Sequence, residues 1–292
     1  MNLYLRFSSI VILFFAIIIS CKKSSDEVPR DPDKLRITRI IQSTVREPQK
    51  VNVTDFIYDD RQRVKRIAFS SGELVYGNLS LEPGHNLSFY YYDTDKNPYR
   101  ASGRVSGGWI ADIFYTYNNT GKLIRDSAIG AGINEVKIHD YTYSPDKLII
   151  KKRYYFLSSP GGIIGNTLTD SVVIRDNNIA EIVYTTGSIG QPAYYYLVSY
   201  DDKINPMSKL NIASVKVTEG LNGFPDNMGP GFCKNNIKSY ATGTISYSGD
   251  RSEKATQPYV YTYTNEGLPQ TCTVITPLET YTFKYTYEEL FK

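Results

Sequence analysis

The sequence predicts an all-β protein, an antiparallel meander of hairpins that forms a soluble barrel-like or curved sheet. Three observations predict this fold. Aromatic residues recur two positions apart, which places both on one face of a strand. Each pair is followed by a polar turn and then an aliphatic residue. No amphipathic helix of convincing length interrupts the pattern.

The chain begins with a targeting segment, residues 1–20. Ile10 to Ile19 is an unbroken apolar run of ten residues, shorter than the about 20 that a membrane-spanning helix needs. Such a run is typical of a signal peptide. The following Ile18-Ile19-Ser20-Cys21 resembles the bacterial lipobox, which implies that Cys21 carries a diacylglycerol and becomes the first residue of the mature chain. An ordinary cleaved signal with a chance cysteine is the alternative.

Residues 21–34 are polar with two prolines in the stretch 24–33, so we expect a flexible tether. Lys22 follows the cysteine, and in the enterobacterial sorting rule this favours the outer membrane. Ser25-Asp26-Glu27 resembles the short acidic signal that directs Bacteroidota lipoproteins to the cell surface. We therefore expect a lipid anchor in the outer membrane, with the domain either surface-exposed or facing the periplasm.

The composition gives no indication of nucleic-acid binding. Lys and Arg number 33 against 30 Asp and Glu, and no block of like charge occurs. Residues 35–292 suffice for one large β domain or two small ones.

A hairpin unit, made of a strand, a polar turn and a return strand, recurs along the chain. Asn, Asp and Gly in each turn tolerate the left-handed backbone, and the aliphatic residue that follows starts the return strand. The unit occurs at Phe56-Ile57-Tyr58 before Val64, Tyr115-Thr116-Tyr117 before Leu123, Tyr141-Thr142-Tyr143 before Leu148, and Tyr261-Thr262-Tyr263 before Leu268.

A second unit occurs twice. Tyr92 to Pro98 matches Tyr200 to Pro206 with Tyr, Asp, Asn and Pro in register, and each copy follows a tyrosine-rich strand. The residue before a proline is extended, so each Asn-Pro closes a strand. The two copies suggest two related halves, about 35–140 and 141–292. Residues 223–233 read as a long loop and 281–287 as the last strand.

These motifs resemble those of known families. The stretch YTYNNTGKL at 115–123 resembles the tyrosine-aspartate repeats of Rhs-type proteins. YDDKINP at 200–206, CKNNI at 233–237 and YTYTNEGLP at 261–269 are similar to a family of Bacteroidota lipoproteins with a porin-like domain of unknown function. Met207 departs from the aromatic residue that this family has after Asn-Pro. The resemblance implies an antiparallel barrel-like sheet in the cell envelope, and it implies no chemistry.

Porin-like does not by itself mean a pore. A spanning barrel needs strands of about 9–11 residues with an apolar, lipid-facing row. The alternate rows here are often Thr, Lys and Asn, which favours a soluble barrel over a membrane barrel.

The sequence contains few residues that could serve in catalysis or metal binding. His85 and His139 are its only histidines, neither has a partner at metal-ligand spacing, and we expect both at the surface or in turns. Residues 93–97 mimic an EF-hand start, but Pro98 replaces the required Gly and Arg104 the required Glu. We expect the neighbouring acidic residues at 59–60, 201–202 and 288–289 to lie in turns and at the edges of strands. We therefore predict no cofactor, no metal and no catalytic residue.

Tyrosine is the one residue type in excess, with 26 of 292 residues. Exposed rings can stack on a sugar, whereas cross-strand aromatic pairs mainly stabilise the sheet, by about 0.2–1 kcal/mol each. The regular placement before turns favours the structural reading. The candidate ligand-binding residues are Tyr90, Tyr92, Trp109, Tyr194 and Tyr196.

Four further residues are candidates for modification. The exported compartment permits a disulfide between Cys233 and Cys272, with two buried free thiols as the alternative. Asp126-Ser127-Ala128 and Asp170-Ser171-Val172 resemble the O-glycosylation acceptor of exported Bacteroidota proteins.

Taken together, the residues favour a lipid-anchored, non-catalytic binding or scaffold module of the cell envelope, whose partner is a glycan or an envelope protein. The alternatives are a polysaccharide hydrolase and a purely structural envelope protein. Facing carboxylates in a cleft would favour the hydrolase, and a fully buried tyrosine ladder would favour the structural protein.

Overall fold

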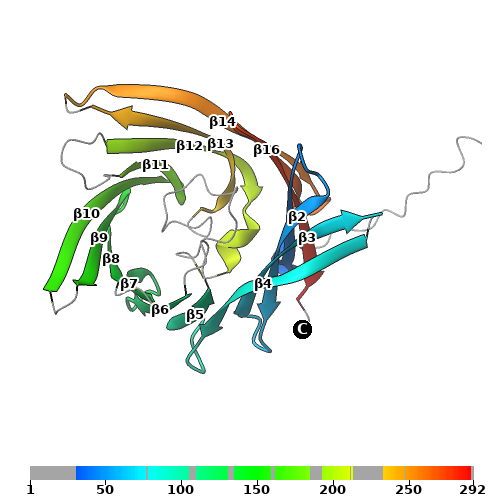
Figure 1. The fold of residues 1–292 in the computed structure, drawn as a ribbon, viewed down its shortest axis with the longest axis horizontal. Helices are drawn as coiled ribbons and strands as arrows, with labels where there is room; N and C mark the ends of the chain where they lie inside the picture. Colours follow the sequence, from blue (N-terminus) through cyan, green and yellow to red (C-terminus); the bar gives the residue numbers. More distant parts are fainter. Residues whose placement is uncertain are drawn as a thin grey trace, which may run out of the picture.

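The polypeptide folds into one antiparallel sheet that closes on itself (Figure 1). The computed structural model describes residues 31–76, 78–104, 110–130, 135–158, 162–184, 193–210, 212, 233–246 and 248–290. Within them, sixteen strands pair in chain order and β1 pairs with β16. The predicted all-β antiparallel meander is confirmed, and of the two predicted shapes the sheet takes the closed barrel. No helix in this part of the chain is long and apolar enough to cross a membrane.

The strands are β1 (Leu35–Thr44), β2 (Lys50–Tyr58), β3 (Val64–Val75), β4 (Asn78–Tyr90), β5 (Arg100–Arg104), β6 (Ile110–Tyr117), β7 (Leu123–Gly130), β8 (Glu135–Tyr143), β9 (Lys147–Ser158), β10 (Gly162–Arg175), β11 (Asn178–Tyr184), β12 (Ala193–Ile204), β13 (Asn235–Ile245), β14 (Arg251–Tyr263), β15 (Pro269–Ile275) and β16 (Thr280–Glu289). Two short 3-10 helices, η1 (Pro32–Lys34) and η2 (Pro206–Lys209), complete the described structure. The Lys209 ammonium binds Asp33 at 2.8 Å, so the end of the predicted tether is held against the barrel.

Three of the four recurring turns share one geometry. In the β6–β7 turn the Gly121 amide donates to the Asn118 carbonyl at 3.0 Å, and the Asn118 amide donates to the Lys122 carbonyl at 2.9 Å. Gly121 has a φ of 79°, the left-handed backbone that closes such a hairpin. The β2–β3 and β14–β15 turns repeat this arrangement, with Gln62 and Gly267 in the left-handed position. The predicted hairpins are therefore confirmed.

Four tyrosines near the ends of strands make a recurring bond across the sheet. Four hydroxyls donate to a backbone carbonyl at the start of the preceding strand, where the ladder has a β-bulge. A bulge leaves a carbonyl without its ladder partner, and the hydroxyl of the neighbouring strand satisfies it. The bonds are Tyr58 to Ile37 (2.6 Å), Tyr91 to Val64 (2.9 Å), Tyr200 to Ile179 (2.7 Å) and Tyr287 to Pro269 (2.8 Å).

The two Asn-Pro units lie at the ends of β4 and β12, eight strands apart. Tyr92 to Pro98 follows β4, whereas Tyr200 to Ile204 still belongs to β12. In the second copy Asn205 caps η2 by accepting from the Met207 amide at 3.0 Å, and Met207 is buried. The division into two related halves, about 35–140 and 141–292, stays a prediction.

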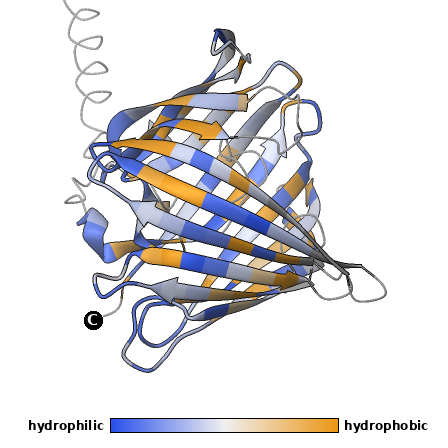
Figure 2. Ribbon diagram, turned by 90° about the vertical axis from the view of Figure 1, so that its left-hand side faces the viewer, coloured by the Kyte–Doolittle hydropathy of each residue, from blue (hydrophilic) through white to orange (hydrophobic). Residues whose placement is uncertain are grey.

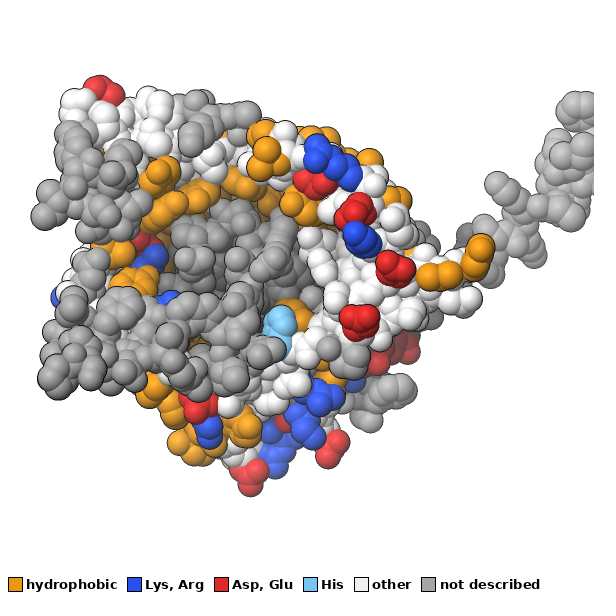
Figure 3. Space-filling view, viewed as in Figure 1, with side chains coloured by type: hydrophobic (Ala, Val, Ile, Leu, Met, Phe, Trp, Pro, Cys, Tyr) orange, Lys and Arg blue, Asp and Glu red, His pale blue; other side chains and the backbone are white. Residues whose placement is uncertain are grey.

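The apolar core lies inside the barrel. Buried residues from strands all round the sheet form one cluster, among them Ile40, Phe56, Leu148, Ile182 and Phe283. Hydrophilic and hydrophobic segments alternate along the strands (Figure 2), as expected where successive side chains face opposite sides. The view into the barrel shows hydrophobic side chains around the opening and charged side chains on the outer surface (Figure 3).

The outer face carries cross-strand ion pairs. They join Arg39 to Asp55 (2.5 Å), Arg100 to Asp112 (2.9 Å), Arg125 and Arg153 to Asp140 (2.6 and 2.5 Å), and Arg251 to Glu181 (2.7 Å). Each acid lies next to an inward-facing core or packed residue in the sequence, so its own side chain points outward.

Candidate functional site

A strip of tyrosines lines the inner wall of β11–β14. The ring of Tyr184 stacks on those of Tyr194 and Tyr196, with centroids 5.4 and 5.6 Å apart. Tyr196 is 6.2 Å from Tyr240, which is 6.0 Å from Tyr259. All but Tyr259 are partly exposed. This inner tyrosine strip therefore combines the cross-strand ladder expected from the sequence with rings that keep part of their surface accessible.

The other predicted ligand-binding residues lie elsewhere. Tyr90 follows the inward-facing Phe89, so its side chain points out of the barrel and is 41% exposed. Tyr92 is 61% exposed and stacks on Tyr99, with centroids 4.3 Å apart. Tyr90 therefore does not share a face with Tyr194 and Tyr196, whose rings point into the barrel. Ligand binding by the candidate residues stays a prediction. Trp109 lies outside the described residues.

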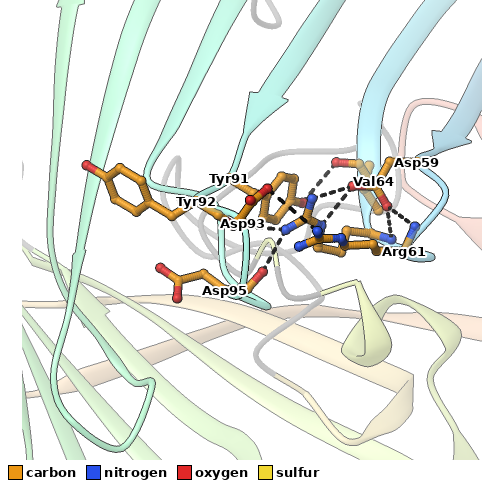
Figure 4. Close-up of polar contacts among 8 residues, drawn as sticks. Asp59, Arg61, Val64, Tyr91, Tyr92, Asp93 and Asp95 are labelled. Atoms are coloured by element: carbon orange, nitrogen blue, oxygen red, sulfur yellow. Dashed lines mark hydrogen bonds and ion pairs between the residues drawn. The ribbon is translucent and has the colours of Figure 1, made fainter.

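Polar contacts join the loop after β4 to the β2–β3 turn (Figure 4). The Arg63 guanidinium lies over the Tyr91 ring, 4.4 Å from its centroid, and donates to the carbonyls of Tyr92 (3.1 Å) and Asp95 (2.9 Å). The same guanidinium binds Asp59 at 2.7 Å. Although burial acts to raise it, hydrogen bonds from Arg63 hold the pKa of Asp59 below its ordinary value.

The turn that mimics an EF-hand start does not gather ligands. The Asp93 side chain is 96% exposed and lies 3.6 Å from Arg61. Asn97 instead donates to the Gly121 carbonyl at 3.1 Å, which joins this loop to the β6–β7 turn. In the described ranges, no three His, Cys, Asp or Glu side chains form a group that could hold a metal ion. The loop is a structural connection between hairpins.

The inner wall also contains a buried polar cluster that the sequence did not indicate. On β7 and β8, Asp126 lies 2.6 Å from the His139 ring and accepts from the Tyr141 hydroxyl at 2.5 Å. On β9 and β10, the Lys152 ammonium lies 2.5 Å from Asp170. All five side chains are at most 7% exposed. Burial, followed by the Asp126 charge, raises the pKa of Tyr141 well above its usual range.

This cluster corrects the expectation for the histidines. Both lie on strands rather than in turns. His139 is 4% exposed and is bound to Asp126. His85 is partly buried on β4 and stacks on Phe69, with centroids 4.7 Å apart.

The acids that the hydrolase alternative would use are engaged in other contacts. Asp126 and Asp170 face inward, but both are nearly fully buried with a protein partner. Among the neighbouring acids, Asp201 accepts from the Lys203 amide at 2.9 Å and from the Tyr263 hydroxyl. Glu288 accepts from Arg36 at 2.6 Å. A glycosidase needs two carboxyl groups that a substrate can reach, and none of these acids forms such a pair.

Cys233 and Cys272 are buried free thiols, which is the second of the two alternatives considered for them. The Cys233 thiol lies 3.1 Å from the Tyr200 hydroxyl. Burial raises the pKa of Cys233 to about 11 and that of Cys272 to about 12. Thiols with such pKa values are poor nucleophiles at neutral pH.

The structure describes two of the predicted modification sites, the serines, and not the predicted lipidation site. Ser127 and Ser171 are partly exposed on β7 and β10, each beside the buried acid of its motif. The aspartates of both Asp-Ser motifs thus have a structural role in the inner wall, and glycosylation of the serines stays a prediction. Cys21 and the signal peptide lie outside the described residues.

The comparisons with known proteins concern the fold. No family model and no curated protein matches the sequence. A porin-like protein from Bacteroides vulgatus is similar in structure, with a TM-score of 0.55 at 13% identity over 87% of this chain and 98% of that chain. A porin-like protein from Bacteroides uniformis has a TM-score of 0.45 at 14% identity over 86% and 98%. The likeness to the first is one of fold, and it agrees with the porin-like fold that the motifs implied.

Proposed function

We propose that this chain is a lipid-anchored, non-catalytic binding module of the outer membrane, whose inner tyrosine strip binds a glycan. The observation that carries the proposal is the strip itself, a row of partly exposed rings on the neighbouring strands β11, β12 and β13 that ends at the buried Tyr259 on β14. Aromatic rings offer flat apolar faces with a polar hydroxyl at the edge, and sugar rings have apolar faces with polar rims. The lipid at Cys21 holds the barrel at the membrane.

The outer face supports a barrel that stands beside the bilayer rather than within it. An arginine or lysine facing lipid at the bilayer midplane costs about 2–4 kcal/mol. Arg39, Arg125 and Arg153 lie in the middle of their strands and point outward, each with an acid. A lipid-facing band needs apolar side chains at these positions. The lipid anchor would then be the only attachment to the membrane.

Membrane attachment is tested by comparing the native chain with the Cys21→Ser variant. The native chain should incorporate an alkyne-tagged fatty acid and sediment with membranes. The variant should incorporate none and stay in the supernatant without detergent. A Cys21→Ser chain that resists extraction from membranes by alkaline carbonate would show instead that the barrel wall spans the bilayer.

Glycan binding is tested by electrophoresis of the native chain in detergent gels that contain a panel of polysaccharides, with an assay for released reducing sugar. Retardation without release is expected. Loss of two stacked rings removes about 0.5–1.5 kcal/mol each, so Tyr194→Ala/Tyr196→Ala should weaken the dissociation constant about 5- to 150-fold. The matched control is Tyr90→Ala/Tyr92→Ala on the outside of the barrel.

Two outcomes would contradict the glycan reading. Release of reducing sugar would show a hydrolase. Equal retardation of the inner and outer double variants would place the glycan away from the strip.

A further inference from the structure

Strands β13 and β14 pair over only part of their length. Their ladder runs from Ile245 opposite Arg251 to Ser239 opposite Pro258 and goes no further in the described residues. Beyond this point β13 continues through residues 235–238 beside β12, and β14 continues through residues 259–263 beside β15. The two strands therefore diverge and leave a wedge in the barrel wall, which we call the β13–β14 wedge.

The sequence contains a physical cause for the wedge. Pro258 has no backbone N–H to donate and lies at the last pair of the ladder. Past it, the alternate peptide groups of residues 259–263 that do not bond to β15 point toward β13. Residues 235–238 in the same way present peptide groups toward β14. Each wall of the wedge is thus an open strand edge, a ready template for another strand.

The wedge contains free space. A groove of about 670 Å³ is lined by Tyr200, Asp201, Asp202, Lys238, Tyr259, Val260, Tyr261 and Tyr263. Val260 is 57% exposed and faces outward, because its neighbour Tyr259 is buried inside. At the wide end the Tyr263 hydroxyl donates to Asp201, which joins β14 to β12 and holds the mouth of the wedge in place.

The charges at the wedge are divided along its length. Lys238 is exposed and makes no ion pair with any residue that the structure describes. Asp202, nearer the mouth, has a side chain that is 83% exposed and lies 3.3 Å from Lys203. An occupant with an acidic side chain beside Lys238 and a basic one beside Asp202 would complement both.

We propose that the β13–β14 wedge binds an extended peptide segment of a partner protein, which adds as a strand between β13 and β14. Only an extended chain carries donors and acceptors along both of its edges at the spacing that the two walls require. The unpaired stretch of residues 259–263 corresponds to about five residues of strand, or about 17 Å at 3.3 Å per residue. An acidic side chain of the segment faces outward beside Lys238.

The test selects ten-residue peptides from a displayed random library on the native full-length chain in detergent. Enriched peptides are expected to alternate β-branched with polar residues and to carry an acid. Their binding should slow hydrogen exchange of residues 235–238 and 259–263 while leaving the β15–β16 ladder unchanged. Failure of the library to enrich any peptide, or protection at another strand, would overturn the proposal.

A charge reversal provides the matched control. Lys238→Glu should weaken an acid-bearing peptide about three- to tenfold, the size expected when an exposed pair becomes a repulsion. Replacing the acid of the peptide with lysine should restore binding to this variant. Lys284→Glu, on the exposed outer face of β16, should have no effect. Equal effects of the two reversals would show non-specific attraction and contradict strand addition at the wedge.

Discussion

Four tyrosine hydroxyls donate to carbonyls at the β-bulges. Their contribution to stability can be tested by Tyr→Phe substitutions, each of which removes a single oxygen atom. Tyr287→Phe deletes the donor to the Pro269 carbonyl, a bond of 2.8 Å beside a buried residue. The net contribution of such a bond is about 0.5–1.5 kcal/mol, and a buried carbonyl left without a partner costs about 1–3 kcal/mol. We expect a loss of about 1–2 kcal/mol in the free energy of unfolding. Tyr58→Phe, which removes the donor to Ile37 at 2.6 Å, should lose a similar amount.

The assay is equilibrium unfolding in urea, followed by fluorescence and far-ultraviolet circular dichroism, with coincident transitions as the condition for a two-state treatment. Tyr92→Phe is the control, because its ring is 61% exposed and surface changes usually stay within about 0.5 kcal/mol. The bonds of Tyr58 and Tyr200 lie on different hairpins, so their losses should add. If Tyr287→Phe shifts the midpoint no more than Tyr92→Phe, the hydroxyls do not stabilise the bulges and the reasoning fails.

Three further predictions concern the barrel wall. Lys152→Met should lower the free energy of unfolding by about 3–5 kcal/mol, because it removes the ammonium that is bound to the buried Asp170 carboxylate. Lys152→Met/Asp170→Leu should recover most of this loss in the same urea titration. Cys233 and Cys272 should react with a disulfide reagent at pH 8 only after unfolding. Burial raises the pKa values of both thiols above the ordinary 9.0. The stability that the two cysteines confer is therefore complete below about pH 9 and decreases as the pH rises toward 11 and 12. Over this range, the urea midpoints of the native chain and of Cys233→Ala/Cys272→Ala should converge. Gly243→Ala should destabilise the barrel, since a Cβ there would lie 2.3 Å from a backbone oxygen of β14 and 2.4 Å from a tyrosine ring; a thermal melt unchanged by this substitution would contradict the packing.

Local chemistry made the hairpins predictable. Residues 115–123 contain a complete strand end, turn and return, and each part follows from nearby residues such as Asn118 and Gly121. The closing of the sheet into a barrel was only one of two predicted shapes, because closure depends on pairing between β1 and β16, which lie more than 200 residues apart in the chain. The wedge was not predicted either. Pro258 indicates an interrupted ladder only when its neighbours on β13 are known.

The inner polar cluster could not be predicted from the sequence for a related reason. Asp126, His139 and Lys152 are spaced along three strands, and the strand register decides which residues meet. In the sequence, Asp126 instead attracted attention as part of an Asp-Ser motif. Prediction also grouped Tyr90 with Tyr194, although the alternation around the core residue Phe89 already places Tyr90 on the outside. Counting strand parity from the core outward would have separated them.

The seam between the first and last strands has a consequence for how the chain acquires its structure. Leu35 pairs with Glu289, and the Leu290 amide donates to the Lys34 carbonyl at 2.7 Å. Because β1 lacks one neighbour until β16 is available, its edge stays open until the last strand has been made. Contacts between the two ends of a chain close slowly, since the loop entropy is lost before any pairing is gained. Completion of the barrel is therefore a late event, and the first strand needs protection from aggregation until the last strand is available.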